Sequence, residues 1–255
     1  MTDPLHSFQL KNKVAIITGA SSGIGAQTAK LFSSVGATVI AAARRIDRLE
    51  DLAENNPNII PIQCDVTSDE DCENLVQSTI TQCEKVDILS NNAGISDPVA
   101  ALDEDLSEFR RVLQVDLVSC FYLSQLCARI MKEQDNGGAI VNVASIHGFV
   151  GSSPNNQPGY SAAKGGLVNL TRELALEWAR YNIRVNAIAP GYFATELTDE
   201  MIAGESGRKW IERNTPMRRP GNVEELDGAM LLLSSDAGSY ITGETISIDG
   251  GWLAR

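Results

Sequence analysis

The strongest constraint on the fold is the alternation of short apolar runs with longer helical patterns along the chain. Most of the runs are apolar at nearly every position, as strands buried on both faces of a sheet are. Between them, apolar residues recur at helical spacing. In 25–36, Leu31, Phe32 and Val35 share one side, and Gly36 ends the helix. The expected strands are VAIIT (14–18), TVIAAA (38–43), IIPIQC (59–64), VDILSN (86–91), AIVNVA (139–144), IRVNAIA (183–189) and TISID (245–249).

This alternation predicts an α/β fold, in which a parallel sheet is covered by helices on both faces. The crossovers between strands should be right-handed. A length of 255 residues allows one large core or two small ones. Because no break in the alternation marks a boundary, we expect a single domain over 1–255.

Composition and charge argue against several classes of function. The formal net charge is -12, whereas nucleic acids and anionic membrane surfaces attract clustered Lys and Arg. Residues 1–13 lack the apolar core of a secretory signal, and no run approaches the roughly 18 apolar residues of a membrane span. We therefore expect a cytoplasmic protein whose partners include neither nucleic acid nor membrane.

The cysteine pattern points to packing rather than to chemistry. The chain has five cysteines, with no CxxC pair and no metal-like spacing relative to the two histidines. Scattered cysteines in an odd number fit reduced thiols, and buried cysteine behaves as a small apolar side chain. We expect structural cysteines and no metal site.

A glycine-rich loop, TGASSGIG (18–25), connects the first expected strand to the first expected helix. Its glycines at 19, 23 and 25 allow a sharp turn and close approach to a ligand. The helix N-terminus that follows offers free N–H groups and a partial positive charge to a pyrophosphate. This position is where dinucleotide sites occur, although a glycine-rich turn that binds nothing is the alternative. The loop lacks the Gly-Lys-Ser/Thr ending of a nucleotide triphosphatase.

The end of the second expected strand bears on the choice of cofactor. Folds that bind NAD often place an Asp or Glu there, against the ribose 2′-hydroxyl. Here the residues are Arg44 and Arg45, and an arginine can pair with a 2′-phosphate. Arginines in place of an acidic residue favour NADP(H) as the cofactor, with NAD(H) still possible. Of the two, Arg44 is the stronger candidate for contact with the 2′-phosphate. Alternatively, both arginines simply begin a solvated helix over 46–54, in which Arg45 could pair with neighbouring acids.

The stretch YSAAK (160–164) separates a tyrosine and a lysine by one helical turn, after a proline that suits a helix start. A free tyrosine has a pKa of about 10, and a nearby ammonium should lower it. Tyr160 would then exchange a proton with a substrate oxygen, to which Ser145 donates a hydrogen bond. An isolated pair of this kind is usually a surface feature; Ser145 and the glycine-rich loop favour the catalytic interpretation. Further along this helix, an apolar stripe is expected in the core or a subunit interface: Leu167, Leu170, Leu174 and Trp178.

Further short motifs follow in order along the chain, and several of them have low specificity when taken singly. In this order and at these intervals they are highly specific together, and they span the chain from about residue 10 to the C-terminus. They are TGASSGIG (18–25), CDVT (64–67), NNAG (91–94), VNVAS (141–145), YSAAK (160–164), APG (189–191) and IDGG (248–251).

This set resembles the classical short-chain dehydrogenase/reductase family. The resemblance implies a single-domain Rossmann fold with a doubly wound, seven-stranded parallel sheet in the order 3-2-1-4-5-6-7, and a homotetramer. It implies an NADP(H)-dependent enzyme that interconverts a ketone and a secondary alcohol, either a carbonyl reductase or a 3-oxoacyl reductase. The alternatives are an NAD-dependent polyol or sugar dehydrogenase and a non-catalytic, cofactor-sensing protein on the same fold.

The resemblance also implies roles for individual residues. Ser145, Tyr160 and Lys164 would be catalytic, and Lys164 would also bind the nicotinamide ribose. Asp65 and Val66 would lie at the adenine, and Asn91 would lie along the cofactor and the sheet. The other residues implied to contact the cofactor are Gly19, Ser21, Ser22, Gly23, Ile24, Gly25, Arg44, Arg45, Asn92, Ala93, Gly94, Tyr160, Pro190, Gly191, Phe193 and Thr195.

One position departs from the family pattern. A fourth catalytic residue, usually Asn in a V-N-L stretch, is here Asp116 in Val115-Asp116-Leu117. An Asp keeps the backbone carbonyl and nearly the same shape, but it brings a possible charge that would favour the ammonium of Lys164. The proton relay attributed to this position could survive with a different pH profile, or the exchange could be neutral; both interpretations stay open.

The alternation of strand and helix patterns becomes irregular over 195–219. The resemblance implies that this segment is a mobile lid over the substrate. We expect a medium-sized ketone, uncharged or weakly polar. His147 lies two positions beyond Ser145, so it either meets the substrate or is a loop histidine without contact to it. The residues that could line an apolar substrate pocket are His147, Phe149, Tyr192, Met201 and Trp210.

Overall fold

The computed structural model describes residues 5–134 and 136–254. Its centre is a parallel, seven-stranded sheet in the order β3-β2-β1-β4-β5-β6-β7. This confirms the predicted fold class and strand order, and the strand ends differ from the predicted ones by no more than two residues. The strands are β1 (Val14–Thr18), β2 (Thr38–Ala43), β3 (Ile59–Gln63), β4 (Ile88–Asn91), β5 (Gly138–Val143), β6 (Ile183–Pro190) and β7 (Thr245–Ile248).

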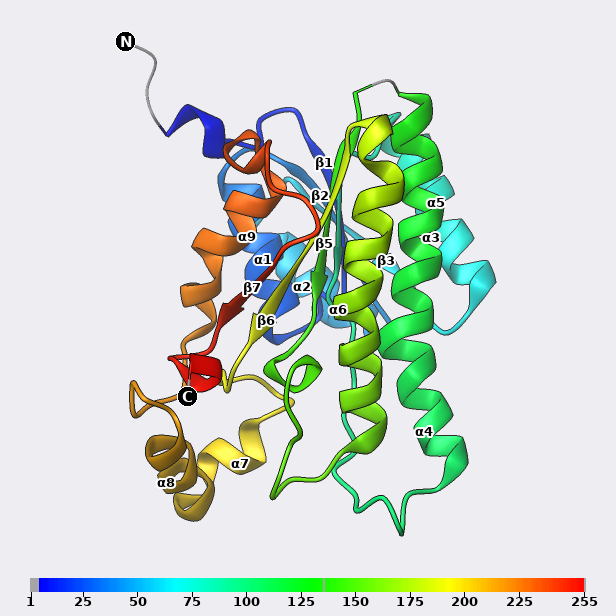
Figure 1. Cartoon of the computed structure of the whole chain (residues 1–255). Helices are drawn as coiled ribbons and strands as arrows, with labels where there is room; N and C mark the ends of the chain where they lie inside the picture. The colour runs from blue at the N-terminus through cyan, green and yellow to red at the C-terminus, as the bar shows by residue number, and fades with distance from the viewer. Residues whose placement is uncertain (1–4, 135, 255) are drawn as a thin grey trace.

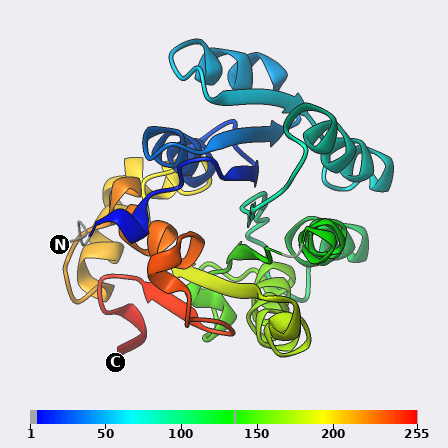
Figure 2. The ribbon, with the colours of Figure 1, turned by 90° about the horizontal axis from the view of Figure 1, so that it is seen from above.

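Helices cover both faces of this sheet (Figures 1 and 2). Helices α1, α2 and α9 contribute apolar side chains to one face, and α3, α5 and α6 contribute to the other. The helices are α1 (Gly23–Ser34), α2 (Ile46–Glu54), α3 (Asp69–Cys83), α4 (Leu106–Leu113), α5 (Ser119–Glu133), α6 (Pro158–Trp178), α7 (Asp199–Ala203), α8 (Glu205–Asn214) and α9 (Asp227–Ser234).

Strand β1 shows why the apolar runs carry no alternation of polar residues. Ala15 and Ile17 point into the cluster shared with α1 and α9, whereas Val14 and Ile16 point into the cluster shared with α3 and α5. Successive side chains of a strand point to opposite faces. Because both faces are covered, every position of the strand is buried.

Helix α6 begins at Pro158, as the sequence predicted, and its apolar stripe belongs to the core. Leu167 is fully buried, and Leu174 and Trp178 pack in the cluster on the α3–α5 face of the sheet. Of the two locations considered for this stripe, the core is therefore the right one. The burial of this stripe fixes the rotation of α6, and with it the face that carries Tyr160 and Lys164.

Asn91 ties the middle of the sheet to the helices. Its Nδ2 lies 2.9 Å from the oxygens of both Ser124 and Asn142, and 3.2 Å from the Cys120 carbonyl oxygen. Asn91 thus lies along the sheet, as expected, and it is the residue that follows, Asn92, that lines the cavity described below.

The cysteines pack in the interior. Four of the five are buried, and Cys83 is half-buried. Burial raises the pKa of the Cys120 thiol to about 11 and that of Cys127 to about 12, so both remain thiols at neutral pH. Among the described helices, none combines the length and the apolar character that crossing a membrane requires.

The carboxyl ends of the parallel strands meet at one edge of the sheet, where ligands bind in open α/β folds. Beyond this edge lie α7 and α8, at the lower end of the molecule in Figure 1. These two helices make up most of the segment 195–219, in which the sequence predicted a cover over the substrate.

Candidate active site

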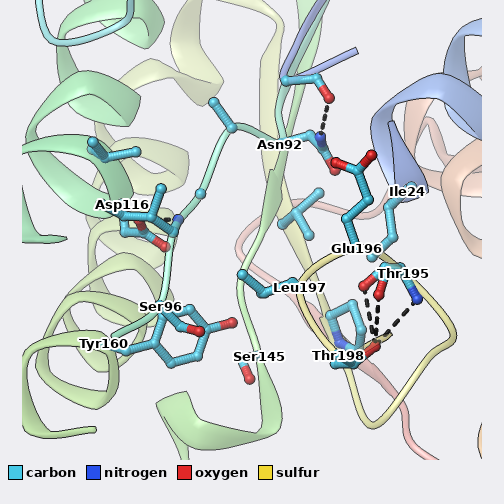
Figure 3. Close-up of a pocket in the computed structure, with 18 of the residues that line it drawn as sticks. Ile24, Asn92, Ser96, Asp116, Ser145, Tyr160, Thr195, Glu196, Leu197 and Thr198 are labelled. Carbon is cyan, nitrogen blue, oxygen red and sulfur yellow. Dashed lines mark hydrogen bonds between the residues drawn. The ribbon is translucent and has the colours of Figure 1, made fainter. Parts of the chain in front are cut away.

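A cavity of about 1090 Å³ runs along this edge, from the glycine-rich loop to the first turn of α6 (Figure 3). Most of the residues singled out in the sequence line it. Gly25, Asn91, Phe149 and Trp210 are not among its lining residues. The predicted residues that line it are Gly19, Ser21, Ser22, Gly23, Ile24, Arg44, Arg45, Asp65, Val66, Asn92, Ala93, Gly94, Asp116, Ser145, His147, Tyr160, Lys164, Pro190, Gly191, Tyr192, Phe193, Thr195 and Met201.

The glycine-rich loop needs its glycines for conformation and for close packing. Gly19 and Gly23 have φ values of +65° and +53°, in the left-handed region that favours glycine. A Cβ on Gly25 would lie 2.4 Å from both the Asn92 amide nitrogen and the Gly19 carbonyl oxygen. Gly25 therefore lets the loop close on itself and on Asn92, although it does not itself line the cavity.

Hydrogen bonds join this loop to the segment after β4. The Thr18 hydroxyl accepts from the backbone N–H groups of Asn92 (3.0 Å) and Ala93 (3.1 Å). The Asn92 side chain donates to the Thr18 carbonyl oxygen at 3.0 Å. One wall of the cavity is thereby fixed between two strand ends that are distant in sequence.

At the end of β2, the two arginines occupy different surroundings. The charge of Arg44 and hydrogen bonds from Thr67 lower the pKa of Asp65, outweighing the effect of its burial, which acts to raise it. Arg45 donates from Nη2 to the hydroxyls of Ser21 (2.9 Å) and Ser22 (3.0 Å). This end of the cavity therefore offers guanidinium and hydroxyl donors, together with the first turn of α1.

Arg45 also pairs with an acid, but not with a neighbour in sequence. Its Nη2 lies 3.0 Å from a carboxylate oxygen of Glu196, which is 151 positions further along the chain. Arg45 does directly precede α2, as that alternative had it, but its carboxylate partner comes from beyond β6 and not from its own helix.

At the other end of the cavity, Tyr160, Lys164 and Ser145 come together, as the sequence predicted. The Lys164 Nζ lies 5.4 Å from the centre of the Tyr160 ring. A hydrogen bond with Ser145 acts to lower the Tyr160 pKa, which places the two hydroxyl groups together. The Ser145 hydroxyl also accepts from the His147 backbone N–H at 3.1 Å, which holds its side chain in the turn that follows β5.

Asp116 reaches Lys164 from the junction of α4 and α5. It lies in a π-helical stretch (Gln114–Val118), a distortion that is frequent at functional sites. Its Oδ2 is 3.0 Å from Lys164 Nζ, and its Oδ1 accepts from the Ile95 N–H at 2.9 Å. Lys164 also donates to the Val143 carbonyl oxygen at 2.9 Å. The ammonium is thus held by a buried carboxylate and by the end of β5.

Gly94 makes this arrangement possible. A Cβ at this position would lie 3.0 Å from Asp116 Oδ2 and 3.5 Å from Lys164 Nζ. A side chain at 94 would crowd the Asp116 carboxylate, and glycine lets the chain after β4 pass close to the ion pair.

Burial and the ion pair act on the protonation of all three groups. Burial raises the pKa of the Asp116 carboxyl, against the opposite effects of Lys164 and the Ile95 N–H. Burial lowers the pKa of Lys164, but the charges of Asp116 and Tyr160 raise it above its ordinary value. Lys164 therefore remains an ammonium at neutral pH.

The sequence predicted that Lys164 would lower the pKa of Tyr160, and this effect is present, although burial turns the net shift in the other direction. Burial raises the pKa of Tyr160, and the Asp116 carboxylate raises it further. Lys164 and Ser145 do lower it, as expected, but burial outweighs them. In this structure the hydroxyl is therefore protonated at neutral pH.

The substrate side of the cavity is aromatic. The His147 Nε2 lies 3.4 Å from the Tyr192 hydroxyl, and the His147 ring meets the Tyr160 ring edge-on at 6.4 Å. Burial lowers the pKa of His147, so its ring is neutral at neutral pH. His147 thus faces the site, and the loop histidine without contact is the less fitting of the two interpretations.

Two predicted pocket residues lie elsewhere. Trp210 packs against Tyr192, with ring centres 5.7 Å apart, and the Trp252 ring is tilted against both rings, with centres 5.2 and 5.4 Å away. Phe149 is 42% exposed and does not reach the cavity. Trp210 therefore supports the pocket through Tyr192.

Sequence reasoning missed several residues of the site. Glu196 lines the cavity opposite Arg45, and Trp252 reaches Tyr192 from the C-terminal end of the chain. Glu196 directly follows Thr195, which was singled out, but nothing local indicates its distant partner. The Ile95 N–H that holds Asp116 is a backbone group, which sequence patterns do not reveal.

Comparison with known proteins agrees with this geometry. A family model described as "Enoyl-(Acyl carrier protein) reductase" matches residues 19–253. The chain is 36% identical to a 2-dehydro-3-deoxy-D-gluconate 5-dehydrogenase of Dickeya dadantii, over 98% of this chain and 99% of that protein. It is 37% identical to a 3-oxoacyl-acyl-carrier-protein reductase of Thermotoga maritima (96% and 99% covered). It is 38% identical to an NAD-dependent glycerol dehydrogenase of Listeria innocua (97% and 96% covered).

Solved structures share the whole architecture. A short-chain type dehydrogenase/reductase from Mycobacterium marinum matches with a TM-score of 0.94 and 37% identity, covering 98% of this chain and 99% of that one. A gluconate 5-dehydrogenase from Burkholderia cenocepacia, in complex with NADP and tartrate, also has a TM-score of 0.94, at 29% identity with 99% and 100% covered.

Fold, cavity and relatives together define an oxidoreductase that acts on CH–OH or C=O groups with a nicotinamide nucleotide. The chain belongs to the short-chain dehydrogenase/reductase family.

Proposed function

We propose that the protein is an NADP(H)-dependent oxidoreductase that interconverts a ketone and a secondary alcohol, of the carbonyl reductase or 3-oxoacyl reductase type. The carrying observation is the pairing of Tyr160 with a Lys164 ammonium at one end of a cavity whose other end offers Arg44 and Arg45. A dinucleotide with an additional phosphate fits these two sets of donors, because one end supplies cations and the other a proton donor.

The protein's own groups handle the proton. Tyr160 gives its hydroxyl proton to the carbonyl oxygen of the ketone, and the Ser145 hydroxyl donates a hydrogen bond to the same oxygen. Lys164 stabilises the phenolate that remains. The nicotinamide, when bound, supplies or accepts the hydride. Because burial keeps Tyr160 protonated at neutral pH, its hydroxyl has a proton to donate to a ketone in that range.

Lys164 has one donor left for the cofactor. An ammonium has three N–H donors, and the Asp116 carboxylate and the Val143 carbonyl oxygen each lie within 3.0 Å of Lys164 Nζ. We assign the third to the nicotinamide ribose. Asp116 enters this scheme through Lys164, which makes it a positioning residue and not a proton donor to the substrate.

The remaining lining residues are assigned to the length of the cofactor. The glycine-rich loop and the N-terminus of α1 would hold the pyrophosphate. Asp65 and Val66 would lie at the adenine, and Arg44 and Arg45 at the 2′-phosphate. Pro190, Gly191, Phe193 and Thr195 would lie beside the nicotinamide; all of them line the same cavity.

For the substrate, we propose a medium-sized ketone that is neutral or weakly polar. Tyr192 and the neutral ring of His147 stand next to Tyr160, and Met201 adds an apolar contact. These groups suit apolar or ring-bearing substituents beside the reacting carbonyl.

A second candidate is an NAD-linked polyol or sugar dehydrogenase. Two of the relatives are named as a gluconate-derivative 5-dehydrogenase and a glycerol dehydrogenase. The polar lining residues Ser96, Asn155 and Gln157 could hydrogen-bond a hydroxylated substrate.

The deciding experiment measures nicotinamide oxidation and reduction by the pure protein over neutral ketones, oxoesters, oxoacyl thioesters, polyols and sugar acids, with NADPH and NADH side by side. Faster turnover of a neutral ketone or oxoacyl thioester with NADPH is expected. Preference for NADH and a polyol or sugar acid would replace the first candidate by the second. In Arg44→Gln, the KM for NADPH should rise about tenfold while that for NADH changes less, since one charge-assisted hydrogen bond is lost.

The assembly and location remain proposals as well. We propose a cytoplasmic homotetramer of single-domain subunits, with 195–219 as a mobile cover. Exposed apolar side chains on α5 and α6 and directly before α5, among them Phe121, Leu176 and Val118, offer contact surface. Light scattering should give about four times the 27.4 kDa chain mass; a monomeric mass would contradict the tetramer.

A further inference from the structure

Glu196 connects the start of the segment 195–219 to the opposite wall of the cavity. Its carboxylate lies 3.0 Å from Arg45 Nη2 and also pairs with Arg48 of α2. In Figure 3 its side chain extends from the position after Thr195 toward Ile24 in the first turn of α1. An ion bridge thus crosses from the chain after β6 to the chain after β2.

The groups around the Glu196 carboxylate are cations and hydrogen-bond donors, which suit an anion. The Arg45 guanidinium that it contacts also donates to the Ser21 and Ser22 hydroxyls, and Ser22 immediately precedes α1. The two guanidinium groups and a hydrogen bond with Ser22 lower the pKa of Glu196 to about 2, so its charge persists at all working pH values. These donors are the ones to which the proposed function assigns phosphates of the cofactor.

The bridge is open to exchange. The side chains of Arg45, Arg48 and Glu196 are each between 43% and 50% exposed. Exposed ion pairs of this kind are weak, whereas a phosphate offers more oxygens and more charge to the same guanidinium groups. A bound 2′-phosphate could therefore take over Arg45, but only against the competition of Glu196.

We propose that Glu196 is a specificity-determining residue, an internal anion that competes with the 2′-phosphate of the cofactor for Arg45. The inference rests on the proposed function. It adds that the preference for NADPH over NADH is smaller than the arginines alone would give. It also links the cofactor to the substrate cover. When a phosphate replaces Glu196 at Arg45, the ion bridge that holds the start of 195–219 to α2 is broken.

The test compares Glu196→Gln with the wild-type protein in binding rather than in turnover. Dissociation constants for NADPH and NADH are measured by nucleotide fluorescence at fixed salt, and those for 2′,5′-ADP and 5′-AMP by calorimetry. Removal of the charge should tighten NADPH and 2′,5′-ADP about three- to tenfold, the range expected for the loss of one or two exposed ion pairs. NADH and 5′-AMP should change by less than about twofold, since they lack the 2′-phosphate.

The matched control is Glu205→Gln. Glu205 lies in the same segment and pairs with Lys209 on the surface of α8, and it does not line the cavity. It should leave all four constants unchanged, which separates the position of the charge from the net charge of the protein.

Each other outcome is decisive. Weaker binding of NADPH by Glu196→Gln, no change, or equal tightening of NADH and NADPH would overturn the role of Glu196. If the wild-type protein turned over with either nucleotide in those cases, the proposed oxidoreductase would stand. Wild-type protein that bound none of the four probes would overturn the proposed function together with this inference.

Discussion

The ammonium of Lys164 lies 3.0 Å from the carboxylate of Asp116, and both side chains are buried. The family usually has an uncharged Asn in place of Asp116. With Asp, Lys164 has a carboxyl partner that the protein itself supplies at 3.0 Å. Removal of one partner of a buried ion pair is strongly destabilising, because the other charge is left uncompensated. Asp116 thus affects both the position of Lys164 and the electrostatics at Tyr160.

The variant Asp116→Asn should shift the pH dependence of alcohol oxidation. Oxidation needs the deprotonated Tyr160, and the Asp116 carboxylate raises the pKa of that hydroxyl. Removal of the charge should lower the pKa of Tyr160. The limb over which kcat/KM for oxidation rises with pH should therefore move toward lower pH, by up to about one unit. A profile measured with one alcohol across the pH range checks this. An unmoved limb, or one displaced to higher pH, would show that the carboxylate does not act on Tyr160.

The variant Asp116→Ala should be much less stable than Asp116→Asn. Both substitutions remove the charge of the ion pair, but Asn keeps a side-chain oxygen for the Lys164 ammonium and the Ile95 N–H, whereas Ala offers neither group an acceptor. The free energy of unfolding of Asp116→Ala should fall by about 3–5 kcal/mol relative to the wild-type protein, as measured in urea. Equal stability of the two variants would mean that the oxygen contacts to Lys164 and Ile95 are energetically unimportant.

Gly25→Ala should damage the glycine-rich loop. The new Cβ would stand 2.4 Å from the Gly19 carbonyl oxygen, a backbone atom that cannot move away alone. We expect a loss of about 1–3 kcal/mol in unfolding free energy and weaker binding of both nucleotides. Gly228→Ala in α9 is the control, because a Cβ there meets nothing within 4 Å. The control should be neutral or stabilising by up to about 1 kcal/mol; similar losses in both variants would refute the assignment of close packing to Gly25.

Tyr192→Leu and Trp210→Leu should act on substrate selectivity. Tyr192 lines the cavity beside His147, and Trp210 supports its ring from behind. Both variants should raise KM for bulky ketones by about tenfold, the effect of one large apolar contact, and change small ketones little. Steady-state kinetics over a size series checks this. Unaltered kinetics in both variants would count against an aromatic pocket.

Local patterns were enough for the strands and for the pairing of Tyr160 with Lys164. Each strand is an apolar run, so its place could be predicted without knowledge of its neighbours. Tyr160 and Lys164 share a face because they are one helical turn apart. The fold order and the position of Asp116 beside Lys164 followed from the resemblance to a family, since topology is not visible in periodicity alone.

Long-range contacts and burial could not be predicted in this way. Glu196 and Arg45 are 151 positions apart, and no local pattern connects them. Trp252 reaches Tyr192 only because β7 returns the chain to the site. The net pKa shift of Tyr160 depends on how deeply its hydroxyl is buried, which is a property of the packed structure.

The most direct test of the central claim is the turnover of Tyr160→Phe with the best ketone and NADPH. The substitution removes only the hydroxyl, and the half-buried ring keeps its place beside His147. We predict that kcat falls by at least about 100-fold, the contribution of a positioned proton donor, while the dissociation constant of NADPH and the thermal midpoint change little. A kcat equal to that of the wild-type protein would contradict the assignment of Tyr160 as the proton donor, and with it the proposed mechanism.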